Sequence, residues 1–404
     1  MQKKRDSLGI VAYSYHLMIA LIPVLYIYNT PVLNMSLGTV LIILFLPYAL
    51  WRIFKYYQHP RSRELNIVSL VPLIMMFGYY TCRSLSSVNG TILMLAVFIH
   101  LWGIMRGSLD DRVIRRIMER FALLCLAVVL VQLFTNYILH YRFKAVFLNL
   151  LQSQYKEIYY SFVSSSSLYR PAAFFCEPSH FAEYSILPLI SALFPRNNKP
   201  EPKIVLAITA DIILSGSGIG IILLAGVFVW FALVNEEKIS RRIASIIKWS
   251  FIFSIAILLL YRIPFIQKVI QRAFYTYEGY DAVSGRIGYW ASAIEPMDGL
   301  DYLFGYGGSE VFPHFLSGVP ETIYQFGIIG LLLQVMFLVS LLIGKASKYT
   351  WVSVFVFIGL MLAEHLSKPH LYLFYFGFIC ANVVCLDDNV WFRVKIKIGN
   401  FKSH

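Results

Sequence analysis

Apolar residues in this sequence gather into long runs that short polar segments separate. A helix that crosses a bilayer needs roughly 20 mainly apolar residues. The runs that approach this length predict spans at 9–28, 34–53, 66–81, 90–106, 121–140, 181–195, 203–217, 219–234, 249–263, 321–343, 350–365 and 369–386. Only a Ser-Gly segment separates 203–217 from 219–234, which fits either a tight hairpin or a re-entrant segment. The pattern therefore predicts an all-α polytopic membrane protein, a single transmembrane domain over 1–404 with about twelve helices.

Two long segments between the spans, 141–180 and 262–320, fall on the same predicted side of the membrane. Each begins with apolar residues at helical spacing opposite polar ones, over 143–162 and 265–277. Such amphipathic helices either lie in the membrane interface or cap the helix bundle. Prolines and glycines after each of them predict non-helical turns. Both segments are expected to form loops at one surface of the membrane.

The composition agrees with a membrane protein and excludes two other classes, a water-soluble globule and a disordered chain. Of the 404 residues, 58% are hydrophobic and only 14% are charged, and the mean hydropathy is +0.66. This is too little charge to cover a water-soluble globule, and disorder requires low hydrophobicity. The five cysteines show no metal-ligand spacing.

The net charge of +13 would suggest nucleic acid as the partner of a soluble chain. Counted by segment, 25 of the 35 basic residues fall on the side of the N-terminus and 10 on the other side. Basic residues accumulate in cytoplasmic loops. The count predicts that both termini are cytoplasmic and that the two long loops are extracytoplasmic. The charge then serves as a topological anchor, with membrane lipid rather than nucleic acid as the neighbour.

Each long loop presents an arginine beside the membrane, Arg170 in the first and Arg286 in the second. The planar guanidinium binds phosphate oxygens in pairs and stays charged when partly desolvated. The two arginines therefore predict a site for an anion carried on a lipid. In the alternative interpretation, each is an interfacial anchor whose side chain reaches toward lipid headgroups.

Two further polar features fit both a functional and a structural interpretation. Asp211 lies within a predicted span, where an acid either has a function or hydrogen-bonds to another helix. The segment 364–370, which includes His370, forms a predicted outside turn. It either supplies a cation near the anion site or is simply solvated.

Three short motifs follow one another within residues 170–330. They are Arg170-Pro-Ala-Ala-Phe-Phe-Cys-Glu-Pro-Ser-His-Phe-Ala182, Leu214-Ser-Gly-Ser-Gly218, and Ser284-Gly-Arg286 to Trp290 with Gly305-Tyr-Gly307 after it. In their order and predicted outside placement, the motifs resemble those of Wzy-type O-antigen and capsular polysaccharide polymerases.

The resemblance implies a GT-C-like glycosyltransferase that works without metal or cofactor at the outer face of the bacterial inner membrane. Such an enzyme, in lipopolysaccharide or capsule synthesis, takes a growing glycan from undecaprenyl diphosphate. It transfers that glycan to the non-reducing end of a new lipid-linked repeat unit. By the same resemblance, Arg170 and Arg286 hold the diphosphate leaving group. A chain-length regulator and a flippase are implied as possible partners.

Such a reaction needs a general base to activate the acceptor hydroxyl, and the outside candidates are Glu177, His180 and His314. Glu177 is the first choice because it lies in the better-matching motif; alternatively, it pairs with a nearby arginine. The aromatic residues Tyr289, Trp290 and Tyr306 either stack on sugars or anchor the loop in the interface.

Two alternatives remain open. The related O-antigen ligases, which transfer glycan to lipid A-core, carry a histidine pattern that ends in Gly-x-x-Gly. Here Ser317 and Gly327-Ile-Ile-Gly330 match, but Leu316 stands where the histidine belongs and His314 lies two residues earlier, which favours the polymerase. A lipid-linked oligosaccharide flippase or transporter would need paired broken helices and midplane charges. The sequence shows no internal repeat and concentrates its polar groups in the outside loops.

Overall fold

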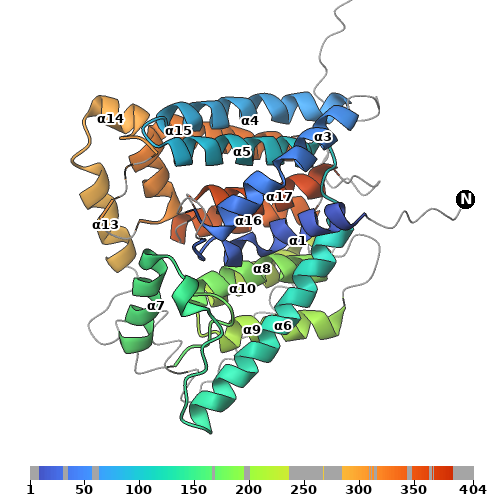
Figure 1. Ribbon diagram of the computed structural model, residues 1–404, viewed down its shortest axis with the longest axis vertical. Coiled ribbons are helices and arrows are strands. Elements are labelled where there is room, and N and C mark those ends of the chain that lie inside the picture. Colours follow the sequence, from blue (N-terminus) through green and yellow to red (C-terminus); the bar gives the residue numbers. More distant parts are fainter. Residues whose placement is uncertain are drawn as a thin grey trace, which may run out of the picture.

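The computed structural model describes residues 9–30, 35–56, 63–165, 169–194, 201–235, 267, 284–308, 310, 312–313, 316–343, 348–363, 366 and 368–384. Within these residues the fold is all-helical, and the extended segments form only isolated β-bridges. The helices, shown in Figure 1, are α1 (Ile10–Leu25), α2 (Leu37–Leu44), α3 (Leu46–Tyr56), α4 (Arg63–Arg83), α5 (Val88–Met105), α6 (Asp111–Tyr137), η2 (Leu148–Leu150), α7 (Ser153–Ser165), α8 (Pro178–Leu193), α9 (Pro202–Leu214), α10 (Gly218–Asn235), α13 (Ser284–Ile294), α14 (Gly299–Phe304), α15 (Gly318–Leu342), α16 (Lys348–Ala363) and α17 (Pro369–Val384).

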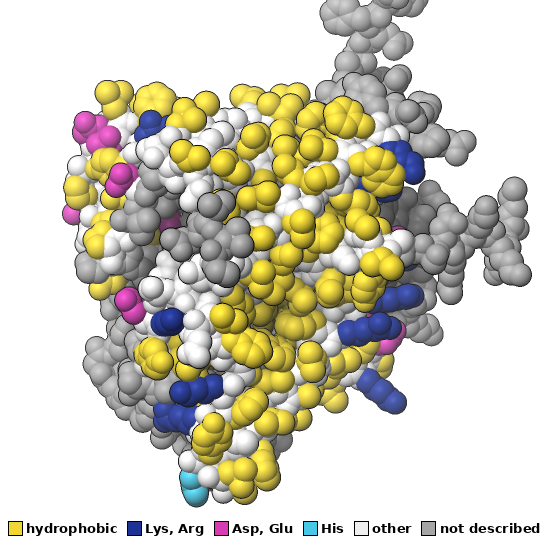
Figure 2. Space-filling model, viewed as in Figure 1, with side chains coloured by type: hydrophobic (Ala, Val, Ile, Leu, Met, Phe, Trp, Pro, Cys, Tyr) yellow, Lys and Arg dark blue, Asp and Glu magenta, His cyan; other side chains and the backbone are white. Residues whose placement is uncertain are grey.

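Several helices are apolar enough to cross a membrane. By length and composition, four described stretches qualify: Leu37–Lys55, Val88–Met105, Asp111–Tyr137 and Gly318–Leu342. Figure 2 shows hydrophobic side chains over the middle of one face, with most of the visible charged groups toward its left and right edges. An apolar band between two polar rims is what a bilayer requires of an embedded protein. The chain is a membrane protein built from helices.

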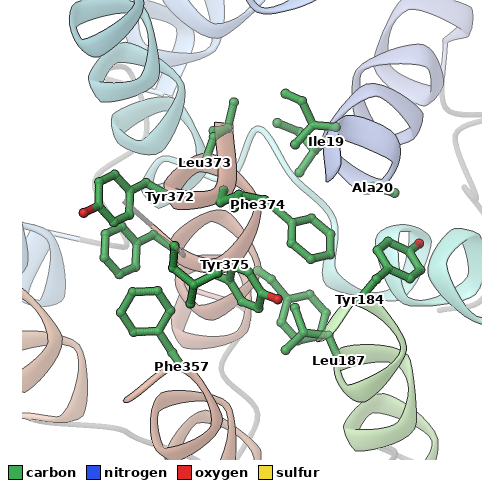
Figure 3. Close-up of a cluster of buried hydrophobic side chains, with 14 of the residues drawn as sticks. Ile19, Ala20, Tyr184, Leu187, Phe357, Tyr372, Leu373, Phe374 and Tyr375 are labelled. Carbon is green, nitrogen blue, oxygen red and sulfur yellow. The ribbon is translucent and has the colours of Figure 1, made fainter. Parts of the chain in front are cut away.

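The centre of the bundle is formed by α17 and α8. Every residue from Leu371 to Ala381 is buried, so α17 contacts protein on all sides. Its rings pack on neighbouring helices: Phe374 stacks on Tyr184 of α8 with centroids 5.5 Å apart, and Phe376 lies 4.8 Å from Phe357 of α16 (Figure 3). These two helices form the rigid scaffold behind the candidate site.

The helices have two distinct ends. At one end, which we call the loop end, the backbone N–H of Gln152 donates to Ile27 beyond α1 (3.1 Å), and Gly308 N–H donates to Arg83 at the end of α4 (2.9 Å). In Figure 1 this end, with α7, α13 and α14, is at the left, and the N-terminus is at the right. Predicted spans that cross the membrane in alternating directions bring these segments to the same end of the bundle. The orientation of the loop end toward the outside of the cell stays a prediction.

Helices occupy each predicted span that the structure describes, while 249–263 lies outside the described residues. The predicted span 34–53 is broken at Phe45 (φ −90°, ψ 1°) into α2 and α3, because Pro47 cannot donate the backbone hydrogen bond that a continuous helix needs. The pair 203–217 and 219–234 forms a tight hairpin, α9 and α10. Its turn uses Gly216 at φ 63°.

The first long loop differs from its prediction. A helix was predicted from 143, but α7 begins only at Ser153. The residues before it hydrogen-bond to the chain that follows α1. The Asn29 N–H donates to Leu150 O (2.6 Å), and the side-chain amide of Gln152 donates to Tyr26 O (2.6 Å). These bonds to the chain after α1 replace the hydrogen bonds of an α-helix, and only the short 3-10 helix η2 forms before α7, so helical periodicity did not predict the structure here.

The second long loop also differs. The motif from Ser284 to Trp290 was predicted as a non-helical turn, yet it forms α13. Glycine weakens a helix by about 1 kcal/mol relative to alanine. Docking compensates, since the Trp290 indole N–H donates to Ser317 Oγ at the start of α15 (3.1 Å). The predicted amphipathic stretch 265–277 falls outside the described residues, apart from the single helical residue 267.

Candidate functional site at the loop end

Arg170 begins a buried segment that leads into α8. The arginine is 7% exposed, which is unusual for this residue type. Three residues later, the side-chain amide of Gln132 on α6 clamps the backbone of Ala173. It accepts from Ala173 N–H (3.0 Å) and donates to Ala173 O (3.4 Å). Ala173 has φ 47°, a left-handed conformation that is rare for a residue with a Cβ atom.

The two hydrogen bonds from Gln132 fix the backbone conformation at Ala173 in the segment that follows Arg170. Backbone strain of this kind persists only where the surroundings enforce it, and it concentrates at functional sites. Gln132 is itself buried, with 5% exposed. Gln132, on a neighbouring helix, thus fixes the backbone of the segment three residues after Arg170.

Cys176, Glu177 and His180 continue the segment into the first turn of α8. Glu177 is the N-cap residue, but its side chain makes no capping hydrogen bond, and Pro178 occupies the first helical position. Glu177 and His180 are both half-buried, while Cys176 is buried. Burial, and after it the neighbouring Glu177 carboxylate, raises the pKa of the Cys176 thiol to about 12. The thiol is therefore neutral at physiological pH.

Tyr155 on α7, which is 5% exposed, lies within electrostatic range of Cys176 in this segment. The Tyr155 ring lies 5.5 Å, edge to face, from that of Tyr26 at the end of α1, and the Tyr26 hydroxyl hydrogen-bonds to the Tyr155 hydroxyl. Burial raises the pKa of Tyr155 well above its usual value; the Tyr26 hydrogen bond opposes this, and Cys176 and Glu321 add to it. Groups from α1, α7, the Arg170 segment and α15 thus act on one hydroxyl.

Two buried glutamates in the same region were not among the sequence candidates. Glu183 on α8 and Glu321 in the first turn of α15 are each 4% exposed. Glu321 Oε1 accepts from the Gln325 side chain (3.2 Å), and the Glu183 carboxylate lies within electrostatic range of Tyr26. Charged residues are seldom fully buried without a partner. Both acids lie at the start of apolar runs, so the hydropathy pattern did not single them out. Their position in the first turn of a predicted span was the one sequence feature that could have identified them.

The second loop packs against a break in α15. Gly327 has φ 67°, which interrupts the helix and leaves the carbonyls before it available to other donors. Tyr306 N–H donates to Tyr324 O (2.8 Å), Gly307 N–H to Gln325 O (2.9 Å), and the Tyr79 hydroxyl to Phe326 O (2.9 Å). A Cβ at Gly327 would lie 2.1 Å from Leu303 O, so only glycine fits this crossing.

The predicted residues fall into separate groups. Arg170, Glu177 and His180 lie in one continuous segment. Tyr289 and Trp290 lie on α13, where Tyr289 is exposed and Trp290 is bonded to Ser317. Tyr306 lies beyond α14, with its ring 4.9 Å from that of Tyr324. Arg286 also belongs to α13, but its side chain, like the whole of His314, is outside the described part of the chain.

His370 corrects the expectation of a solvated turn at 364–370. Its imidazole is 7% exposed, and its Nε2 lies 2.9 Å from Thr39 Oγ1 and 3.3 Å from Ser36 Oγ. The ring also stacks on Tyr26, with centroids 5.4 Å apart. His370 therefore links α2 and α17 to the Tyr26–Tyr155 pair, which a short polar turn in the sequence does not reveal.

The chemistry available at the loop end is that of charged and hydroxyl side chains. Among the described residues, no three His, Cys, Asp or Glu side chains are grouped in a way that could hold a metal ion. No protein-family model and no curated protein matches the chain. The fold and the site define a membrane protein whose described residues form an all-helical fold and include a buried arginine, Arg170, and two buried glutamates, Glu183 and Glu321.

Proposed function

We propose that this protein is a metal-independent glycosyltransferase that polymerises lipid-linked oligosaccharide repeat units at the outer face of the bacterial inner membrane. The donor is a growing glycan on undecaprenyl diphosphate, and the acceptor is the non-reducing end of a new lipid-linked unit. The proposal rests on the ordered motifs at 170–330 and on the twelve-span GT-C-like topology that the sequence predicts.

One structural observation supports it most strongly: Arg170 is buried, in a strained segment that Gln132 holds in place at one end of an apolar bundle. An arginine that served only as a headgroup anchor would extend toward the headgroups. A buried and positioned guanidinium is suited instead to two oxygens of a diphosphate. The start of α8, whose backbone N–H groups receive no side-chain cap from Glu177, favours negative charge at the same place.

The reaction assigns a role to each group. An acceptor hydroxyl attacks the anomeric carbon of the donor glycan, and a general base, Glu177, His180 or His314, takes its proton. The bond to the diphosphate breaks, and its electron pair stays on the departing phosphate oxygen. Arg170 and Arg286 stabilise that charge, and the two arginines thereby take the role that a divalent cation would otherwise have. Tyr289, Trp290 and Tyr306 offer rings for the sugars.

The length distribution of glycan in the native host tests the proposal. Arg170→Ala should leave the protein in the membrane but abolish long chains, and Arg170→Lys should rescue poorly because lysine lacks the bidentate fork. The matched control is Arg142→Ala. Arg142 belongs to the same loop end, but it is exposed and lies over the Tyr169 ring at 5.9 Å. Unchanged ladders in Arg170→Ala would reject the proposal.

Deleting the gene separates the polymerase from a ligase that transfers finished glycan to lipid A-core. Loss of a polymerase leaves single repeat units on the core, whereas loss of a ligase leaves none.

A further inference from the structure

A buried acid within the bundle plays no part in the proposed reaction. Asp211 occupies the last turn of α9, and 0% of it is exposed. Neither of its carboxylate oxygens has a hydrogen-bond partner among the described residues. By contrast, Asp111 forms an ion pair with Arg115 at the other end of the bundle. Asp211 therefore differs from the paired acids of this protein.

Among the described residues, the helices that pack closely against α9 are α6, α8 and α10. Helix α6 places Cys125 within electrostatic range of Asp211, and α8 places Tyr184 within range of the same Cys125. Helix α10 contains no titratable residue. Both Cys125 and Tyr184 are buried, with 0% and 1% exposed. The surroundings thus offer weak donors and no positive charge among the described residues.

Three physical effects oppose a negative charge at this position. Burial of a carboxylate without donors is costly. The C-terminal turn of a helix carries the negative end of its dipole, which repels an anion. Within a membrane-spanning bundle, an ionised side chain loses the water that would otherwise compensate. A neutral carboxylic acid avoids all three effects and brings its own O–H donor.

A metal cation is a poorer solution than a proton. Hard cations take several oxygen ligands at once, but the part of the chain that the structure describes groups no three acidic, His or Cys side chains that could hold one. The hydroxyl of Ser215, in the adjoining turn, is already committed to Ile212 O at 2.7 Å. The described residues around Asp211 therefore do not supply the set of ligands that a cation needs.

We propose that Asp211 is an intramembrane proton-binding site, in which the carboxyl group is carried as the neutral acid between α6, α8 and α9. The proposal stands on burial, on the missing partners and on the helix end, and it does not depend on the glycosyltransferase function.

Infrared spectroscopy of the purified full chain tests this site directly. With aspartate carrying ¹³C in its side-chain carboxyl group, the native protein at neutral pH should show the carbonyl stretch of a protonated acid, shifted by the label. The band should be missing from Asp211→Asn. A native spectrum that contains only ionised aspartate would overturn the proposal without reference to any variant.

A pair of asparagine variants gives a second test. Asp211→Asn replaces a neutral acid by a neutral amide of the same shape, so the midpoint of thermal unfolding should stay the same. Asp111→Asn, the matched control, removes the charge that faces Arg115 (2.8 Å) and should lower that midpoint. Equal losses in the two variants would contradict a neutral Asp211. So would a native midpoint that rises with sodium or potassium concentration while that of Asp211→Asn does not.

Discussion

Arg115 and Arg170 lie at opposite ends of the bundle and have different surroundings. At the end opposite the loops, Arg115 donates to the Asp111 carboxylate (2.8 Å), to the Asn382 side chain (2.8 Å) and to the Phe194 carbonyl (3.3 Å). These bonds join α6, the end of α8 and α17. At the loop end, Arg170 leads into a segment with a left-handed alanine and an uncapped helix start. The first arrangement fastens helices together, while the second stores strain beside candidate substrate groups.

This contrast separates structure from function in physical terms. A closed network of charge and hydrogen bonds stabilises only if all partners stay in place. A strained backbone costs stability. The start of a helix, where backbone N–H groups point in one direction, suits the binding of an anion. We therefore expect substitutions at the opposite end to act on folding and those at the loop end to act mainly on binding.

The largest effect on stability is expected at the opposite end. Asp111→Ala leaves the guanidinium of Arg115, of which 11% is exposed, without its carboxylate. Breaking a buried pair in this way costs about 3–5 kcal/mol in free energy of unfolding. Denaturant unfolding in micelles measures it. The control is Asp110→Ala, which removes only the exposed N-cap of α6 and should cost about 1 kcal/mol. Equal losses would mean that the Arg115 network does not stabilise the fold.

At the loop end, a smaller loss of stability should accompany a larger loss of function. Gln132→Leu leaves the buried N–H and C=O of Ala173 without partners, at a cost of about 1–3 kcal/mol. Because Arg170 is then no longer positioned, glycan chains should shorten even where the protein is fully folded. Ser69→Ala loses a buried bond, to Ser340 O (3.1 Å), between α4 and α15 and away from the Arg170 segment. Chain lengths that fall equally in both variants would contradict the positioning role of Gln132.

The smallest expected effect concerns the reactivity of two cysteine thiols at the loop end, Cys176 and Cys82. With a pKa of about 12, only about one Cys176 thiol in ten thousand is ionised at pH 8, so maleimide should modify it very slowly in the folded protein. Cys82, exposed near the end of α4, is the internal reference and should react first. Peptide mass mapping after timed labelling gives both rates. Modification of Cys176 as fast as Cys82 would contradict the burial of the Cys176 thiol.

Hydropathy predicted the helices of the bundle well because each must bury or present an apolar surface about one bilayer thick. It failed where tertiary partners replace local preference. Residues 143–152 pair with the chain after α1, and α13 forms despite its glycines because Trp290 docks on Ser317. The sequence placed Arg170, Glu177 and His180 in one segment.

The sequence did not reveal the groups that surround that segment. Gln132 looks like an isolated polar residue in an apolar run, and its role depends on a backbone 41 residues away. Glu183, Glu321 and His370 begin apolar helices, so their burial at one site follows only from how the helices assemble. Contacts between distant segments carry no local periodicity, and this is why the pattern missed them.

We propose that the loop end recognises a lipid-linked diphosphate through the buried Arg170. Binding of undecaprenyl diphosphate to the purified full chain tests it most directly. Charge-assisted hydrogen bonds contribute about 1.5–3 kcal/mol, so Arg170→Ala should weaken binding about 10–100-fold. The exposed Arg142→Ala control should change it less than about fivefold. Equal affinity in the native protein, Arg170→Ala and Arg142→Ala would contradict the claim.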